Sequence, residues 1–150
     1  MDTELEIRIN AIGSEMAACA ACELKAVSVT RGAGNPPRGL VLEGAERAGK
    51  GCIIAGINPG RASPHEVNWR LQQPAGYAQQ VEFFQERFGE EAAQSNPYYG
   101  KLRDLARQLH LTGPILWTDV VKCESKREAK HAPGVAVQRT CAHRFLTKEL

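Results

Sequence analysis

The chain has 150 residues, which suits a single domain spanning residues 1–150. Its hydrophobic share of 43% and charged share of 24% are those of an ordinary globular protein, and no apolar run approaches the roughly 18 residues that a membrane span needs. A net charge of +2 is too small to indicate nucleic-acid binding by itself. The acidic N-terminus lacks the basic and apolar regions of a signal peptide, so we expect a cytoplasmic protein.

The first third of the chain predicts one helix and one short strand. Apolar residues recur at helical spacing at four positions, Leu5, Ile9, Ile12 and Met16. This helix leads into the pair Cys19 and Cys22, and the Gly-, Asn- and Pro-rich residues 27–37 predict a loop. Residues 40–43 predict a short strand. The following turn, residues 44–51, nearly spells a phosphate-binding loop, but Gly51 lacks the required hydroxyl and a strand follows where a helix is needed.

We expect the chain to be organised around the stretch from Cys52 to Ser63. Its first half is short, apolar and rich in β-branched residues, which predicts a buried strand of a parallel sheet that ends near Gly56. Asn58, Pro59 and Gly60 then stop the strand and make a sharp turn. Open α/β sheets bind ligands beyond the carboxyl ends of their strands, so we expect the ligand here.

The remainder predicts two helices, a second buried strand and a final helix. The first helix has an apolar stripe, Tyr77, Val81, Phe84 and Phe88. A loop over residues 95–100 precedes a helix with its own stripe, Leu102, Leu105 and Leu109. Residues 115–121 predict the second strand, and hence a βαβ unit. The final helix carries Val137, Cys141 and Phe145. Two long strands are too few to bury both faces of a sheet, so we expect that other strands are missing from this chain.

The cysteines predict a metal site. Five is an odd number and nothing indicates secretion, which argues against a disulfide framework. Four of them could supply thiolates to zinc or to an iron–sulfur cluster, namely Cys19, Cys22, Cys123 and Cys141. A thioredoxin-like redox pair at the first two would need a preceding strand, where a helix is predicted. Cys52, inside the apolar strand, is interpreted as an inert core residue.

Taken together, these motifs resemble the iron–sulfur (family 4-like) uracil-DNA glycosylases. The family reads Gly-Glu-x-Pro-Gly at the first strand, where this chain has Gly-Ile-Asn-Pro-Gly from Gly56 to Gly60. At the second strand the family reads Thr-Asn-Val-Val-Lys-Cys, where residues 118–123 read Thr-Asp-Val-Val-Lys-Cys. The first motif itself is similar to that of the mismatch-specific branch of the superfamily. The resemblance extends from about Cys19 to Leu150.

The resemblance implies a three-layer α/β/α sandwich with a short central parallel sheet, lacking its C-terminal strands. It implies a 4Fe–4S cluster on the four cysteines named above, with zinc as the alternative. It also implies a monomer that acts on DNA and hydrolyses the N-glycosidic bond of uracil or another deaminated base flipped out of the helix, in base-excision repair. By resemblance, Asn58 orients the attacking water, and Gly56, Pro59 and Gly60 contact the base or the DNA, with Gly60 close to the base or a phosphate. Tyr98 or, slightly preferred, Tyr99 stacks on the base.

The chain departs from the family at two points. Asp119 replaces an Asn whose amide accepts from uracil N3–H and donates to O4; a carboxylate keeps the acceptor and loses the donor. We therefore expect weakened uracil excision or a preference for a base with an exocyclic amine. The family's His-Pro-Ser motif is not found after Cys141, so the 150 residues alone are expected to be nearly inactive. The alternatives are a non-catalytic nucleic-acid binder with this fold and cluster, and a small zinc-stabilised α/β protein unrelated to DNA.

Overall fold

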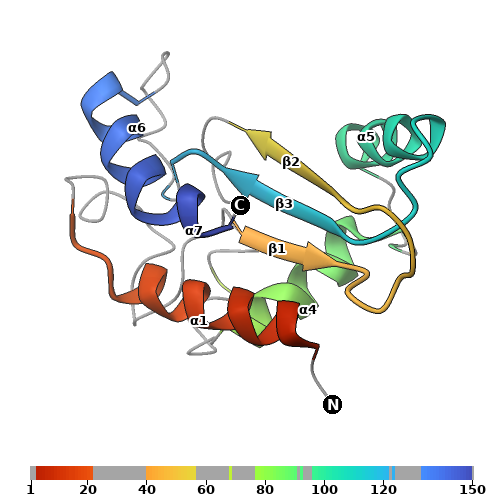
Figure 1. Cartoon of the computed structure of the whole chain (residues 1–150), viewed down its shortest axis with the longest axis horizontal. Helices are drawn as coiled ribbons and strands as arrows, with labels where there is room; N and C mark the ends of the chain where they lie inside the picture. Colours follow the sequence, from red (N-terminus) through yellow and green to blue (C-terminus); the bar gives the residue numbers. More distant parts are fainter. Residues whose placement is uncertain are drawn as a thin grey trace.

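The computed structural model describes residues 3–21, 40–56, 68, 77–90, 92, 96–121, 123 and 133–149 (Figure 1). Its main elements, in chain order, are α1 (Glu4–Ala18), β1 (Leu40–Glu43), β2 (Cys52–Gly56), α4 (Tyr77–Phe88), α5 (Pro97–Gln108), β3 (Ile115–Asp119), α6 (Val135–Cys141), the π-helical turn η2 (Ala142–Leu146) and α7 (Thr147–Glu149). None of the helices within these ranges has the length and apolar character needed to cross a bilayer. The described elements form a small α/β fold.

The three strands form one mixed sheet in the order β1-β3-β2. β2 runs parallel to β3, with α4 and α5 between them along the chain, so the expected βαβ connection is confirmed. β1 runs antiparallel to β3, and the expectation of a wholly parallel sheet is therefore wrong. The reason is the short connection of residues 44–51. A parallel crossover needs a dozen residues or more, so the chain must reverse between β1 and β2.

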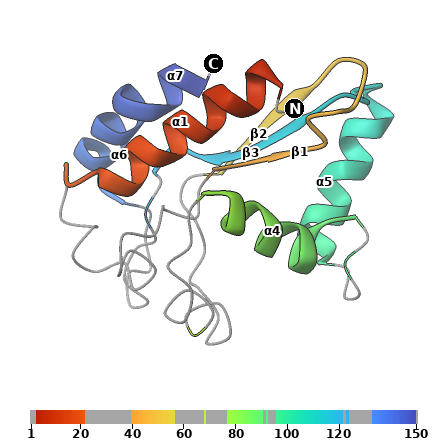
Figure 2. The ribbon, with the colours of Figure 1, turned by 90° about the horizontal axis from the view of Figure 1, so that it is seen from below.

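Helices cover both faces of the sheet (Figure 2). On one face, α1 and η2 pack over β1 and β3 and enclose a cluster of seven buried residues, Ile9, Ile12, Met16, Leu40, Leu42, Leu116 and Phe145. On the other face, α4 and α5 pack over a second cluster whose buried members are Val41, Phe84, Ile115 and Trp117. Successive residues of β1 and β3 alternate between the two clusters, as the period of a strand requires.

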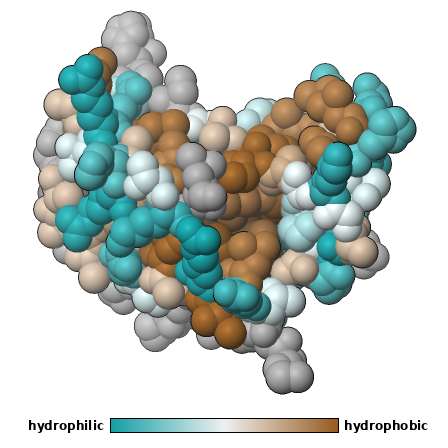
Figure 3. Space-filling model, in the orientation of Figure 1, coloured by the Kyte–Doolittle hydropathy of each residue, from teal (hydrophilic) through white to brown (hydrophobic). Residues whose placement is uncertain are grey.

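β2 is an edge strand and is only partly covered. Ile53 pairs with the buried Leu116 in register, yet its side chain is 42% exposed, and Ala55 is also exposed. The expectation of a fully buried strand is therefore wrong for this face, because no helix among the described residues extends over it. Figure 3 shows apolar surface at the centre of this side of the molecule, in a hollow between α5 and the side that carries α6 and α7.

α5 begins earlier than expected. Residues 97–100, predicted to be a loop, form its first turn, because Asn96 caps the helix by accepting a hydrogen bond from the Tyr98 N–H (3.0 Å) and Pro97 occupies an initial position. The predicted leucine stripe is also wrong in part. Leu105 and Leu109 are 50% and 60% exposed, whereas Arg103 on the same helix is buried.

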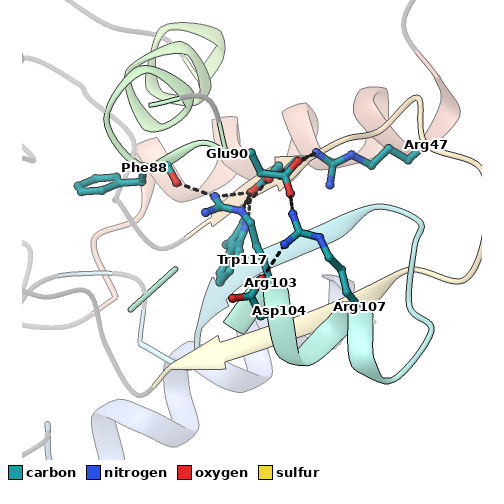
Figure 4. Close-up of polar contacts among 8 residues, drawn as sticks. Arg47, Phe88, Glu90, Arg103, Asp104, Arg107 and Trp117 are labelled. Atoms are coloured by element: carbon teal, nitrogen blue, oxygen red, sulfur yellow. Dashed lines mark hydrogen bonds and ion pairs between the residues drawn. The ribbon is translucent and has the colours of Figure 1, made fainter. Parts of the chain in front are cut away.

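Arg103 is buried because it is paired with Glu43 at the end of β1 (Figure 4). The guanidinium donates from Nε and Nη2 to the carboxylate at 2.9 and 2.8 Å, a two-pronged geometry, and both residues are 4% exposed. Trp117 Nε1 donates to the same carboxylate at 2.7 Å, and Arg103 Nη2 also donates to the Phe88 carbonyl at 2.6 Å. One ion pair therefore joins β1, β3, α4 and α5.

A second, solvent-exposed set of charges surrounds this pair. The Glu90 carboxylate accepts a hydrogen bond from Arg47 at 3.0 Å and also pairs with Arg107 (Figure 4). Arg107 in turn pairs with Asp104, one turn earlier in α5, at 2.7 Å. Because the Arg107 side chain is 56% exposed, solvent screens these pairs and each contributes little. These outer ion pairs therefore cannot replace the stabilisation that the buried pair of Arg103 and Glu43 provides.

The buried pair should dominate the stability of the sheet. Glu43→Gln leaves the Arg103 charge uncompensated in the interior and should lower the free energy of unfolding by about 3–5 kcal/mol. Glu90→Gln, the same change in the exposed set, should cost about 1 kcal/mol or less. Urea unfolding followed by circular dichroism measures both, and equal losses would contradict the assignment.

Candidate functional site

The carboxyl ends of β2 and β3 meet at one edge of the sheet. Gly56, the last residue of β2, lies in register with Asp119, the last residue of β3. The Val120 N–H donates to the Gly56 carbonyl at 2.9 Å and holds the two ends together beyond the strands. The two residues that the sequence assigned to base recognition on separate strands, Gly56 and Asp119, are therefore neighbours in the structure.

The lack of a side chain at Gly56 makes room for the Asp119 carboxylate. A Cβ built on Gly56 would overlap Oδ1 of Asp119, so no other residue fits without displacing that carboxylate. Asp119 is half-buried and directs its carboxylate toward the end of β2, from which residues 57–60 continue. The sequence singled out Gly56 as part of a motif, but it did not indicate this contact.

Four of the predicted site residues lie outside the described residues. They are Asn58, Pro59 and Gly60, which follow β2, and Cys22, which follows α1. Their predicted roles stay predictions. Gly56, the last described residue before Asn58, Pro59 and Gly60 in the chain, lies at the carboxyl edge of the sheet.

Cys19 and Cys141, which are far apart in sequence, pack against the same hydrophobic cluster. Cys19 ends α1, where its N–H donates to the Met16 carbonyl at 3.2 Å, and Cys141 is the last residue of α6. Cys123 lies just beyond β3, two residues after the fully buried Val121. All three cysteines are half-buried. Figures 1 and 2 both place the C-terminal end of α1, the end of β3 and α6 on one side of the molecule.

The described residues do not by themselves make a complete metal site. Among them, no group of three or more His, Cys, Asp or Glu side chains is arranged to hold a metal ion. The three described members of the predicted ligand set, Cys19, Cys123 and Cys141, therefore do not form such a group, and the fourth member, Cys22, lies outside the described residues. Thiolates are the donors that zinc and iron–sulfur clusters take, so the residue types fit either centre.

Cys52 differs in its surroundings from Cys19 and Cys141. It packs against the cluster between β2, α4 and α5, and burial raises the pKa of its thiol. The thiol therefore stays protonated and unreactive at neutral pH, because the thiolate is the nucleophile and the metal ligand. This agrees with the interpretation of Cys52 as a core residue. Cys52 is therefore a suitable control in experiments on the four predicted ligand cysteines.

The two candidate stacking residues have different environments. Tyr99 belongs to an aromatic cluster, with ring centroids 5.1 Å from Phe84, 5.0 Å from Phe88 and 5.1 Å from Trp117. The Tyr99 ring therefore packs against the hydrophobic cluster as part of the core. Tyr98 is 59% exposed and meets Tyr99 edge to face at 5.2 Å. Of the two, Tyr98 has the more accessible ring, whereas the sequence analysis slightly favours Tyr99.

Comparison with models of known protein families, with curated proteins and with solved structures finds no match.

The contact between Gly56 and Asp119 can be tested by adding one methyl group. Gly56→Ala should lower the free energy of unfolding by about 1–3 kcal/mol, because the methyl group must displace the carboxylate or the strand end. The loss should shrink in an Asp119→Ala background, since the overlapping group is then gone.

Gly100→Ala is the matched control. A Cβ at Gly100 meets nothing within 4 Å, and the residue lies in α5. This change should raise stability by about 0.5–1 kcal/mol, because alanine loses less backbone entropy than glycine in a helix. If Gly56→Ala were as well tolerated as Gly100→Ala, the packing of Asp119 on Gly56 would be wrong.

Proposed function

We propose that this chain is a uracil-DNA glycosylase-like protein that acts on a damaged or deaminated base in DNA. The observation that carries the proposal is the juxtaposition of Gly56 and Asp119 at the carboxyl ends of two parallel strands. This is the edge at which open α/β sheets bind ligands. The first motif of the family resemblance begins at Gly56, and the second, on the other strand, contains Asp119.

Helices on both faces of the sheet support the finer assignment of fold, a three-layer uracil-DNA glycosylase-like sandwich. The parallel pair β2 and β3 supplies the central part of that arrangement. The antiparallel β1 departs from the wholly parallel sheet that the resemblance implies.

The chemistry begins with extrusion of a nucleotide, because a duplex hides the glycosidic bond. The base leaves with negative charge, so the rate depends on fixed dipoles and on a well-placed water. We assign the orientation of that water to Asn58, two residues beyond Gly56. An amide is a poor general base, so its contribution is positional and the chemical step is slow.

Asp119 reads the edge of the extruded base in this proposal. Its carboxylate is fixed against Gly56 and accepts hydrogen bonds but donates none. It therefore suits a base that presents N–H groups, including an exocyclic amine, and it repels the O4 carbonyl of uracil. The carboxylate is thus the residue that shifts preference away from uracil.

Tyr98 is the stacking residue in this proposal. Its ring is 59% exposed, whereas the Tyr99 ring is packed between Phe84 and Trp117. Stacking on an aromatic face contributes about 1–3 kcal/mol per base and tolerates any base. Tyr99 then supports Tyr98 through their edge-to-face contact.

The four cysteines Cys19, Cys22, Cys123 and Cys141 hold a 4Fe–4S cluster in this proposal, with zinc as the alternative. The shared packing of Cys19 and Cys141 against one hydrophobic cluster supports it, whereas the three described cysteines are not gathered into a metal-holding group. The centre would tie the end of α1 to α6 and to the end of β3, a structural role away from the reacting base.

The second candidate is a non-catalytic nucleic-acid binder with the same fold and centre. The Asp119 carboxylate at the site favours it, because this group removes the donor that uracil recognition needs. The two candidates differ in one product, the abasic site.

Asp119→Asn should raise uracil release. Restoring the amide donor should speed formation of abasic sites in uracil-containing single-stranded and duplex oligonucleotides by about 5- to 150-fold, equivalent to 1–3 kcal/mol. The measurement is alkaline cleavage of a labelled strand under single-turnover conditions. Asn58→Ala in the same background should abolish the gain. Measurable but equal rates for the native chain and Asp119→Asn would contradict the role of Asp119 in base recognition. Binding of the oligonucleotides without any abasic product would favour the second candidate.

The metal centre has its own test. Anaerobically purified protein should be brown and contain about four iron and four acid-labile sulfide per chain if a 4Fe–4S cluster is bound. Cys141→Ala should lose the colour and the iron, while Cys52→Ala should keep both. A colourless protein with one zinc per chain would show that the centre is zinc and not a cluster. A folded protein without metal would contradict the proposed metal centre.

A further inference from the structure

The outer edge of β2 has backbone groups directed away from the sheet. Cys52 N–H donates to the Pro114 carbonyl at 2.9 Å, and the Gly56 carbonyl accepts from Val120 N–H at 2.9 Å. In a parallel pair, alternate residues bond to the neighbouring strand, so Cys52, Ile54 and Gly56 face β3. The intervening residues, Ile53 and Ala55, direct their N–H and C=O groups to the opposite edge. No strand in the described part of the chain pairs with that edge.

The side chains on this edge are apolar and exposed. Ile53 is 42% exposed, Ala55 is exposed, and the five residues of β2 contain no charge and no proline. Lysine, proline or a bulge are the devices that normally prevent an edge strand from pairing with another chain. The edge of β2 has none of them, so nothing in β2 itself opposes pairing with a further strand.

α5 extends this apolar edge. Leu105 and Leu109, one helical turn apart, are 50% and 60% exposed. Figure 1 shows α5 on the outer side of β2, away from β3, and Figure 3 shows apolar surface over this part of the molecule. A strand added to β2 would extend the sheet toward α5, which Figure 2 places on the side of the sheet opposite α1.

We propose that the edge of β2 pairs with the same edge of a second copy of this chain, antiparallel, about a two-fold axis through Ile54. In this register Ile53 of each copy lies opposite Ala55 of the other. Those are the two residues with outward backbone groups, so the pairing forms four backbone hydrogen bonds and leaves neither residue unused. Ile53 also packs beside Ala55 of the other copy on the exposed face.

A second copy fits this edge because the edge is complementary to itself. Antiparallel pairing about one axis is closed, whereas parallel addition of the same strand would leave an open edge on each new copy. Charge does not oppose it: the Lys50 residues of the two copies, each four positions from the axis, lie roughly 26 Å apart at 3.3 Å per residue. That separation exceeds the Debye length of about 8 Å at physiological salt.

The dimer departs from the monomer that the resemblance implies, and it does not depend on the proposed function. A five-residue edge with two exposed leucines from each copy buries less than a standard interface. We therefore expect a dissociation constant of about 1–100 µM. The mixed three-stranded sheets of two copies would join into one six-stranded sheet, with the two β2 strands at its centre.

Ala55→Pro tests the backbone pairing. The Ala55 N–H points away from β3, so proline removes an outward donor without breaking the sheet, as edge strands allow. Two of the four hydrogen bonds are lost, and the dimer should weaken at least about tenfold in sedimentation equilibrium. Ala55→Thr, which keeps the N–H, should retain the dimer. The proposal would be overturned if the native chain stayed monomeric at about 200 µM, twice the weakest expected dissociation constant. It would also be overturned if Ala55→Pro formed the dimer as strongly as the native chain.

Cross-linking tests the axis even if proline impairs folding. Ile54→Cys places two thiols opposite each other across the axis, where antiparallel Cα atoms are about 4.5 Å apart, within the range for a disulfide. It should form a covalent dimer on mild oxidation. Ile53→Cys faces Ala55 and should not, unless Ala55→Cys is added. Cross-linking by the native cysteines sets the background. Equal dimer from Ile53→Cys and Ile54→Cys would refute the register.

Discussion

The pairing of Arg103 with Glu43 holds the described elements together. Its two strongest hydrogen bonds, at 2.9 and 2.8 Å, lie where α5 crosses the end of β1, and the same groups bind Trp117 on β3 and the last carbonyl of α4. Four elements therefore share one buried charge pair. Removing either charge leaves the other in the interior, which is costly, whereas the surrounding pairs of Glu90 are exposed to solvent.

This arrangement determines where the candidate site lies. Along the chain, α4 and α5 lie between β2 and β3, and both helices pack against one face of the sheet. β3 therefore runs parallel to β2. The carboxyl ends of both strands then meet, with Asp119 packed on the bare Cα of Gly56. The opposite face is closed by α1 and η2, and there Cys19 and Cys141 reach the same cluster.

The same construction leaves β2 at the edge. Among the described elements β2 has one neighbouring strand, β3, and the apolar residues that suggested burial in the sequence are packed against a helix-covered cluster on one face only. The backbone groups of Ile53 and Ala55 point outward for the same reason. An apolar run of this kind is compatible with a central strand or with an edge that pairs between copies, and its composition does not distinguish them.

Local patterns in the sequence determined the three strands, the helices α1, α4 and α5 and the motif positions Gly56 and Asp119, because period and turn chemistry act over a few residues. Asn96 and Pro97 begin α5 although the sequence around them predicts a loop, because a capping Asn followed by Pro is itself a helix-start signal. Only the tertiary structure decided the antiparallel β1, the burial of Arg103 with Glu43, the exposure of Ile53 and the core position of Tyr99. Each of these depends on which element packs against which, and nothing in the local sequence specifies a partner that lies tens of residues away.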